Sequence, residues 1–153
     1  MALQGLLRLG IRTALERSGS ELEELVVSVG LGREAADHVR ETLMAMPALL
    51  VSIDGALARH ADSSRLALWR SLLSYLLMDE DLIPTNEGRP VRGILDDAYL
   101  LHRAAQEMRR DLPGFELRDL DGGTALLRSA LPIGIARELD DRVVRIMQAS
   151  GPR

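Results

Sequence analysis

The sequence contains no cysteine, and this absence excludes disulfide bonds and metal sites built on thiolates. It also suits a reducing compartment, so we expect the protein to reside in the cytoplasm. Lysine is absent too, and all 19 residues of the lysine and arginine class are arginine. Arginine favours ion pairs and anion recognition, but codon bias in a GC-rich genome produces the same preference. The arginine bias therefore carries no functional prediction.

The sequence also lacks an uninterrupted apolar run of the roughly 18 residues that a membrane-spanning helix needs. Arg70 interrupts the richest apolar stretch and Pro47 another. Arg8 and Arg12 stand where a signal peptide has its apolar region. We therefore expect neither a transmembrane segment nor a signal peptide. The basic residues of a predicted helix over residues 2–17 still permit peripheral contact with a membrane.

Length and charge set further bounds. The 153 residues fit one domain over residues 1–153, and a chain of this length buries about 70% of its unfolded surface. The net charge of −4 disfavours nucleic acid as a partner, because phosphate-binding surfaces show a basic excess. No serine lies in a Gly-x-Ser-x-Gly context, so nucleophilic catalysis is not predicted.

Apolar residues recur at helical spacing along most of the chain. This pattern predicts an all-α bundle of about six or seven helices. Pro47 suits the first turn of a new helix, which would follow a helix over residues 33–46. The Asp-Gly-Gly run at residues 121–123 predicts a loop before a short helix that begins at Thr124.

Two helices are expected to form a central hairpin over residues 64–111. Apolar side chains cover more than half of the circumference of the helix predicted over residues 64–78, so we expect that helix to be central. Residues 94–110 form the clearest amphipathic helix. Trp69, the only tryptophan, is expected to anchor the core.

Residues 21–46 follow the outline of a DNA-binding helix-turn-helix, with glycines between two helices. The second helix carries acidic residues among its arginines, so it would meet phosphate without a positive field. DNA binding is therefore the third of three predicted functions.

Three aspartates, Asp81, Asp96 and Asp97, bracket the loop between the two hairpin helices. Hard cations such as Mg²⁺ or Ca²⁺ prefer clusters of oxygen ligands, so this loop predicts a metal site with Asp81 and Asp97 as ligands. Arg89 or Arg92 could instead hold a small anion. Such a site could also support hydrolysis.

The same carboxylates also have a structural explanation. Acidic side chains in the first turn of a helix are stabilised by the helix dipole, and Asp81 ahead of Pro84 suits an Asx-type turn. Asp97 falls at the edge of the apolar stripe, where a buried carboxylate needs a hydrogen-bonding partner. His102 lies about 140° away from it around the helix, so these two residues are not expected to form a catalytic dyad.

Residues 75–77 (Tyr-Leu-Leu), 81–84 (Asp-Leu-Ile-Pro) and 90–98 (Pro-Val-Arg-Gly-Ile-Leu-Asp-Asp-Ala) occur in the order of a known signature. They resemble the YkvA-like family of small bacterial helical domains. The resemblance implies a helical hairpin whose loop is held by aspartates. From the residues themselves, the second helix is expected to begin at Gly93, with Asp96 and Asp97 in its first turn. It implies no activity.

This chain departs from the family pattern at three places. The family's Ser-Pro before the first aspartate is Met78-Asp79 here, and its aspartate after the proline is Thr85. The loop is also about two residues longer and more polar. The loss of a carboxylate at Thr85 weakens a metal site that used it, and the polar loop argues against the membrane association seen in the family.

The leading functional prediction is a non-catalytic interaction or regulatory module that assembles with itself or with another protein. The alternative is a divalent metal or a small anion bound at the loop that carries Asp81, Asp96 and Asp97. DNA binding through residues 21–46 comes third.

Overall fold

The structure, a computed structural model, describes residues 2–17, 20–78, 90–112 and 117–149. This part of the chain contains seven α-helices, one 3₁₀ helix and no strand, so the predicted all-α bundle is confirmed. The elements, in chain order, are α1 (Ala2–Arg17), α2 (Glu21–Ser28), α3 (Ala35–His60), α4 (Ser63–Met78), α5 (Pro90–Glu107), η1 (Arg109–Asp111), α6 (Leu117–Ala130) and α7 (Ile133–Ala149).

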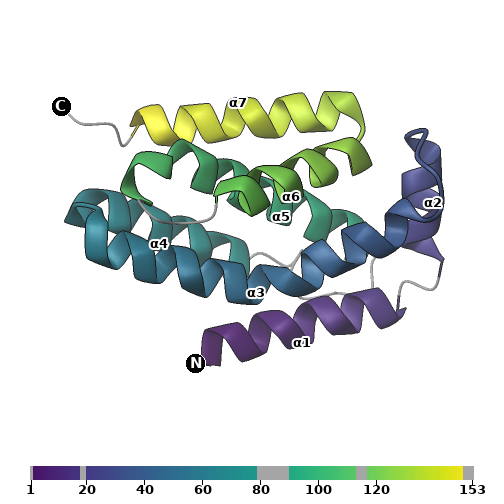
Figure 1. Ribbon diagram of the computed structural model, residues 1–153, viewed down its shortest axis with the longest axis horizontal. Coiled ribbons are helices and arrows are strands. Elements are labelled where there is room, and N and C mark those ends of the chain that lie inside the picture. Colours follow the sequence, from purple (N-terminus) through teal and green to yellow (C-terminus); the bar gives the residue numbers. More distant parts are fainter. Residues whose placement is uncertain (1, 18–19, 79–89, 113–116, 150–153) are drawn as a thin grey trace.

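Helix α5 is the centre of the bundle. It contacts α1, α3, α4, α6, α7 and η1, and Figure 1 shows it between α6 and α7 on one side and α3 and α4 on the other. All six residues from 97 to 102 are buried. Six consecutive buried positions span more than one helical turn, so α5 is covered on every side over this stretch.

Helix α4 is not central, and that prediction was wrong. It packs on α3 and α5, with Trp69, Leu72 and Leu73 buried. Ala67 and Arg70 are exposed, and Leu68 is only half-buried. A wide apolar arc thus did not require burial on all sides, because partly exposed leucines are common on protein surfaces.

Helix α3 runs through Pro47 without a break, so the predicted new helix at this proline is wrong. Pro47 lacks the N–H that would bond to the carbonyl of Leu43, and an internal proline costs about 3 kcal/mol. Buried residues continue on both sides of it at helical spacing, including Leu43, Met46, Leu50 and Ile53. Packing of this apolar stripe offsets the cost and keeps the helix continuous.

Helix α3 is also long and apolar enough to cross a membrane by length and composition alone, with a mean hydropathy of 1.4 over 18 residues. In this fold it packs against α1, α2, α4, α5 and α6. The core helix of a helical bundle satisfies the same criterion, and here the criterion selects the helix that supplies nine buried residues to the interior.

Helix α6 includes residues 121–123, where a loop was predicted. Leu120, Thr124 and Leu127 are buried at helical spacing and keep this segment packed as a helix. Gly123 lies at a contact between helices, since a Cβ atom at this position would lie within ordinary contact distance of two side chains, 3.4 Å from His102 Nε2 and 3.5 Å from Thr42 Cγ2. The glycine therefore serves contact of α6 with α3 and α5 rather than a turn.

Candidate functional site

The site predicted at the acidic loop lies largely outside the described residues. Asp81, Pro84 and Arg89 belong to residues 79–89, and the side chain of Arg92 is likewise outside the described part, although its backbone lies in the first turn of α5. Helix α5 begins at Pro90, a favoured residue for the first helical position, rather than at Gly93.

The described members of this predicted site lie in the first turns of α5. Gly93 and Asp96 are half-buried, whereas Asp97 is buried, with 6% of its surface exposed. Within the described ranges, no group of three histidines, aspartates or glutamates is placed to hold a metal ion. Because Asp81 lies outside those ranges, the metal site at Asp81 and Asp97 stays a prediction.

His102 is buried in α5 with 3% of its surface exposed. Its Nδ1 lies 2.7 Å from the carbonyl oxygen of Ala98, and since that oxygen can only accept, Nδ1 carries the proton. Burial lowers the pKa of His102 despite this hydrogen bond. The ring is therefore neutral at pH 7, and its Nε2 lies against Gly123.

We expect His102 to make folding pH-dependent. Its pKa is lower in the folded state than the ordinary value of about 6.5, so the unfolded chain binds a proton first as the pH falls. The stabilisation is complete above about pH 6.5 and is lost below it, by at most about 1.4 kcal/mol per pH unit. The free energy of unfolding, measured with urea between pH 5 and 7.5, should depend less steeply on pH in His102→Asn than in the wild type. Asparagine keeps a donor for the carbonyl of Ala98.

The exposed His38 provides the matched control for this measurement. His38→Asn should retain the pH dependence of the wild type, because it replaces an exposed side chain and leaves the buried ring of His102 in place. If the free energy of unfolding changed equally steeply with pH in the wild type and in His102→Asn, His102 would not control the pH dependence.

A second group of polar residues forms a pocket that the sequence did not predict. It lies where the end of α5, the helix η1 and the first turn of α4 meet, and its volume is about 680 Å³. We call it the arginine pocket. Its lining residues are Asp62, Ser64, Arg65, Arg103, Gln106, Glu107, Arg109, Arg110 and Asp111.

The first turn of α4 forms one wall of the arginine pocket. Asp62 precedes this helix and accepts hydrogen bonds from the Arg65 backbone N–H at 2.9 Å and from Ser64 Oγ at 2.7 Å. The hydroxyl of Ser64 is the main cause of the lowered pKa of Asp62. Asp62 thus caps the helix as a carboxylate, and the positive end of the α4 dipole borders the pocket.

The arginines of the pocket differ in their partners. Arg65 pairs through Nε with Asp111, and Arg109 lies 2.8 Å from Asp121 Oδ1. Arg103 contacts Asp140, Gln106 and Glu107. Arg110 is exposed, and its side chain makes no hydrogen bond or ion pair with any described residue. The lining holds four arginines and three carboxylates, and Asp121 and Asp140 beyond the lining pair with Arg109 and Arg103.

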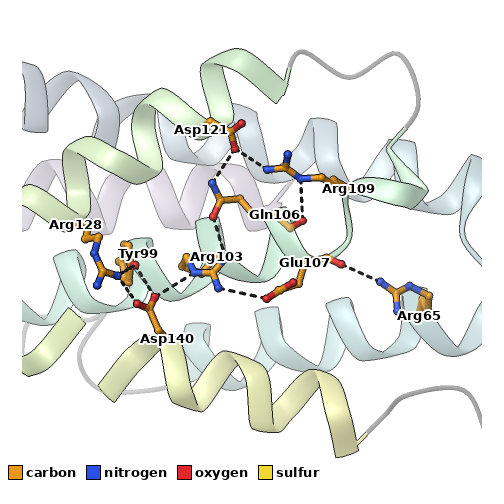
Figure 2. Close-up of polar contacts among 9 residues, drawn as sticks. All are labelled: Arg65, Tyr99, Arg103, Gln106, Glu107, Arg109, Asp121, Arg128 and Asp140. Atoms are coloured by element: carbon orange, nitrogen blue, oxygen red, sulfur yellow. Dashed lines mark hydrogen bonds and ion pairs between the residues drawn. The ribbon is translucent and has the colours of Figure 1, made fainter. Parts of the chain in front are cut away.

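A network of charged groups beside the pocket ties α5, α6 and α7 together, as Figure 2 shows. The buried Tyr99 donates its hydroxyl proton to Asp140 Oδ1 at 2.6 Å and accepts from Arg128 Nη1 at 2.7 Å. Arg128 also pairs with Asp140 Oδ2, and Arg103 Nε lies 3.1 Å from Asp140 Oδ1. We call these four residues the Asp140 network.

The charges of this network are complementary. Burial alone would raise the pKa of Asp140, but hydrogen bonds from Tyr99, Arg128 and Arg103 together lower it. Burial, followed by the hydrogen bond to Asp140, raises the pKa of Tyr99. At neutral pH, Asp140 is therefore an anion and Tyr99 a neutral donor, as these hydrogen bonds require.

Gln106 links the Asp140 network to Arg109. Its Oε1 accepts from Arg103 Nη1 at 2.9 Å, and its Nε2 donates to Asp121 Oδ1 at 2.8 Å. Asp121 in turn accepts from Arg109 (Figure 2). Helical spacing could predict only that Tyr99 and Arg103 are neighbours, because they are four residues apart on α5. It could not predict Asp140, which lies 41 residues after Tyr99.

One of the two arginines on the predicted DNA-binding surface is already paired with carboxylates. Arg40, near the start of α3, lies 2.9 Å from Glu23 Oε1 and 2.8 Å from Asp37 Oδ1. A phosphate would have to displace these carboxylates to bind Arg40, and this argues against the helix-turn-helix interpretation.

Comparison with protein-family models, curated proteins and solved structures gave no match to this chain. The resemblance to the YkvA-like family thus rests on the motifs at residues 75–98 alone and stays a prediction.

Proposed function

We propose that this chain is a non-catalytic binding module that recognises a small polar anion in the arginine pocket. The observation that carries the proposal is Arg110, whose guanidinium borders the pocket and has no acidic partner among the described residues. Three further arginines and the positive end of α4 surround the same space. The guanidinium of Arg110 would meet the anion directly, while Asp111, Asp140 and Asp121 offset the charges of the other three arginines.

The chemistry of the lining supports a particular class of ligand. Guanidinium groups bind phosphate and carboxylate through paired N–H donors. A volume of about 680 Å³ lies within the usual range for small-molecule sites, so it holds more than a single phosphate. Asp62 and Glu107 offer acceptors for hydroxyl or ammonium groups. The favoured ligand is therefore an organic phosphate or carboxylate that also carries hydrogen-bond donors.

Aromatic side chains are missing from the described lining of the pocket, so it lacks a stacking surface for a nucleobase. The pocket's charged groups also sit largely in structural pairs, as with Arg65 and Asp111. Both features support binding without chemistry, which is the role of a regulatory or assembly module. The proposal places the anion in this pocket rather than at the loop bearing Asp81, Asp96 and Asp97.

Calorimetric titration with pyrophosphate and with glycerol phosphate tests this proposal. We expect saturable binding that weakens as salt is added. Arg110→Gln should weaken it about tenfold, because a hydrogen bond to a charged group contributes roughly 1.5–3 kcal/mol. Trp69, the only tryptophan and one turn beyond Arg65 on α4, gives a second readout by fluorescence.

Arg145→Gln is the matched control for Arg110→Gln, since Arg145 is an exposed arginine on α7 outside the pocket lining. It should leave the affinity unchanged. Equal weakening by both variants would indicate nonspecific charge attraction, and no heat or fluorescence change with either phosphate would refute the proposal.

A further inference from the structure

Arg103 belongs both to the arginine pocket and to the Asp140 network. We infer that Asp140 on α7 sets the anion affinity of the pocket by restraining and neutralising Arg103, so that anion binding and the docking of α7 oppose each other. The inference rests on the proposed function and adds a mechanism of regulation to it.

The contacts of Arg103 support this double role. Its Nε lies 3.1 Å from Asp140 Oδ1, its Nη1 lies 2.9 Å from Gln106 Oε1, and its Nη2 lies 3.3 Å from Glu107 Oε1. Only 20% of its side chain is exposed. The same guanidinium is therefore the direct connection between the pocket and α7 (Figure 2).

Electrostatics determine the direction of the effect. Asp140 and Glu107 offset the charge of Arg103 and lower the positive potential that an anion meets in the pocket. A bound phosphate attracts Arg103 away from Asp140 and weakens this tie between α5 and α7. By thermodynamic reciprocity, weakening the tie by mutation must raise the affinity for the anion by a corresponding factor.

Asp140 does not depend on Arg103 alone. Tyr99 and Arg128 also hold it, so Asp140 keeps partners when Arg103 moves toward a ligand. This arrangement makes release of Arg103 a local step rather than a loss of the fold. Its expected consequence is faster opening of α7 while the rest of the bundle stays protected.

Titration of pyrophosphate into Asp140→Asn provides the test. We expect this variant to bind about tenfold more tightly than the wild type. Asp141→Asn is the matched control, because it removes the same charge from an exposed neighbour on α7 that forms no ion pair with an arginine among the described residues. Arg128→Gln removes another tie of Asp140 but leaves Arg103 held, so it should not raise the affinity.

Hydrogen exchange gives an independent readout on the wild type. Saturating pyrophosphate should raise amide exchange across residues 133–149, and in Arg103→Gln it should leave exchange there unchanged. This second measurement decides the question even if Asp140→Asn fails to fold. Binding by the wild type with no rise in α7 exchange would overturn the inference.

The outcomes separate the two proposals. If pyrophosphate binds and Asp140→Asn and Asp141→Asn change the affinity alike, the effect is long-range charge and the coupling is refuted, while the proposed function stands. If neither the wild type nor any variant binds pyrophosphate or glycerol phosphate, the proposed function fails, and the coupling fails with it.

Discussion

Tyr99→Ala should lose roughly 3–5 kcal/mol of folding free energy, the usual cost of truncating a buried aromatic side chain. Tyr99 is 1% exposed on the central helix, and its hydroxyl joins Asp140 and Arg128. The truncation leaves a cavity and removes a hydrogen-bonding partner from both charged groups. Since whole domains have about 5–15 kcal/mol of stability, the variant should be close to unfolding, as urea denaturation would show.

Tyr99→Phe separates the two causes of this loss. It keeps the ring in the core and removes only the hydroxyl, so it should cost about 1.5–3 kcal/mol, the usual value of a hydrogen bond to a charged group. If the two variants were equally destabilised, the hydroxyl network rather than packing would supply the stability. If neither lost stability, α5 would not be the centre of the core.

Gly123→Leu should destabilise the fold by about 1–3 kcal/mol or more through overpacking. A Cβ atom at this position already lies 3.4 Å from His102 Nε2 and 3.5 Å from Thr42 Cγ2, so the remaining atoms of a leucine would push α6 away from α3 and α5. Thermal unfolding monitored by circular dichroism would measure the loss as a lower midpoint.

Gly122→Leu is the matched substitution one residue earlier in the same helix. Gly122 is exposed, and a Cβ atom there would meet nothing within 4 Å. This variant should gain about 0.5–1 kcal/mol, since leucine has a higher helix propensity than glycine. Opposite signs for the two variants would support the close contact at Gly123. Stabilisation by both would show that α6 packs more loosely than this structure indicates.

The same glycine marks the limit of sequence patterns. Residues 121–123 read as a loop because Asp-Gly-Gly is typical of turns. In the fold, Gly123 is a point of contact between helices. The prediction of a new helix at Pro47 failed for a similar reason. Burial of the apolar side chains on either side of Pro47 outweighs the cost of an internal proline. Local signals fail where packing supplies more free energy than propensity.

The arginine pocket could not be inferred from spacing. Arg65 and Asp111 are 46 residues apart, and Arg103 and Asp140 are 37 apart. Helical periodicity identifies neighbours within one helix, such as Arg103 and Glu107. It carries no information about which charge on another helix will be opposite.

The sequence by itself determined the class of fold and the faces of its clearest helices. Apolar residues at helical spacing require burial along one side, and this requirement holds whatever the helices pack against. It also placed Asp97 at the edge of the apolar stripe, and that residue is buried. Only the tertiary structure decided that α5 is central, that Arg103 connects the pocket to Asp140, and that Arg110 lacks an acidic partner in the described chain. Those facts depend on how helices far apart in sequence are oriented, and many arrangements of the same amphipathic helices bury their apolar faces equally well.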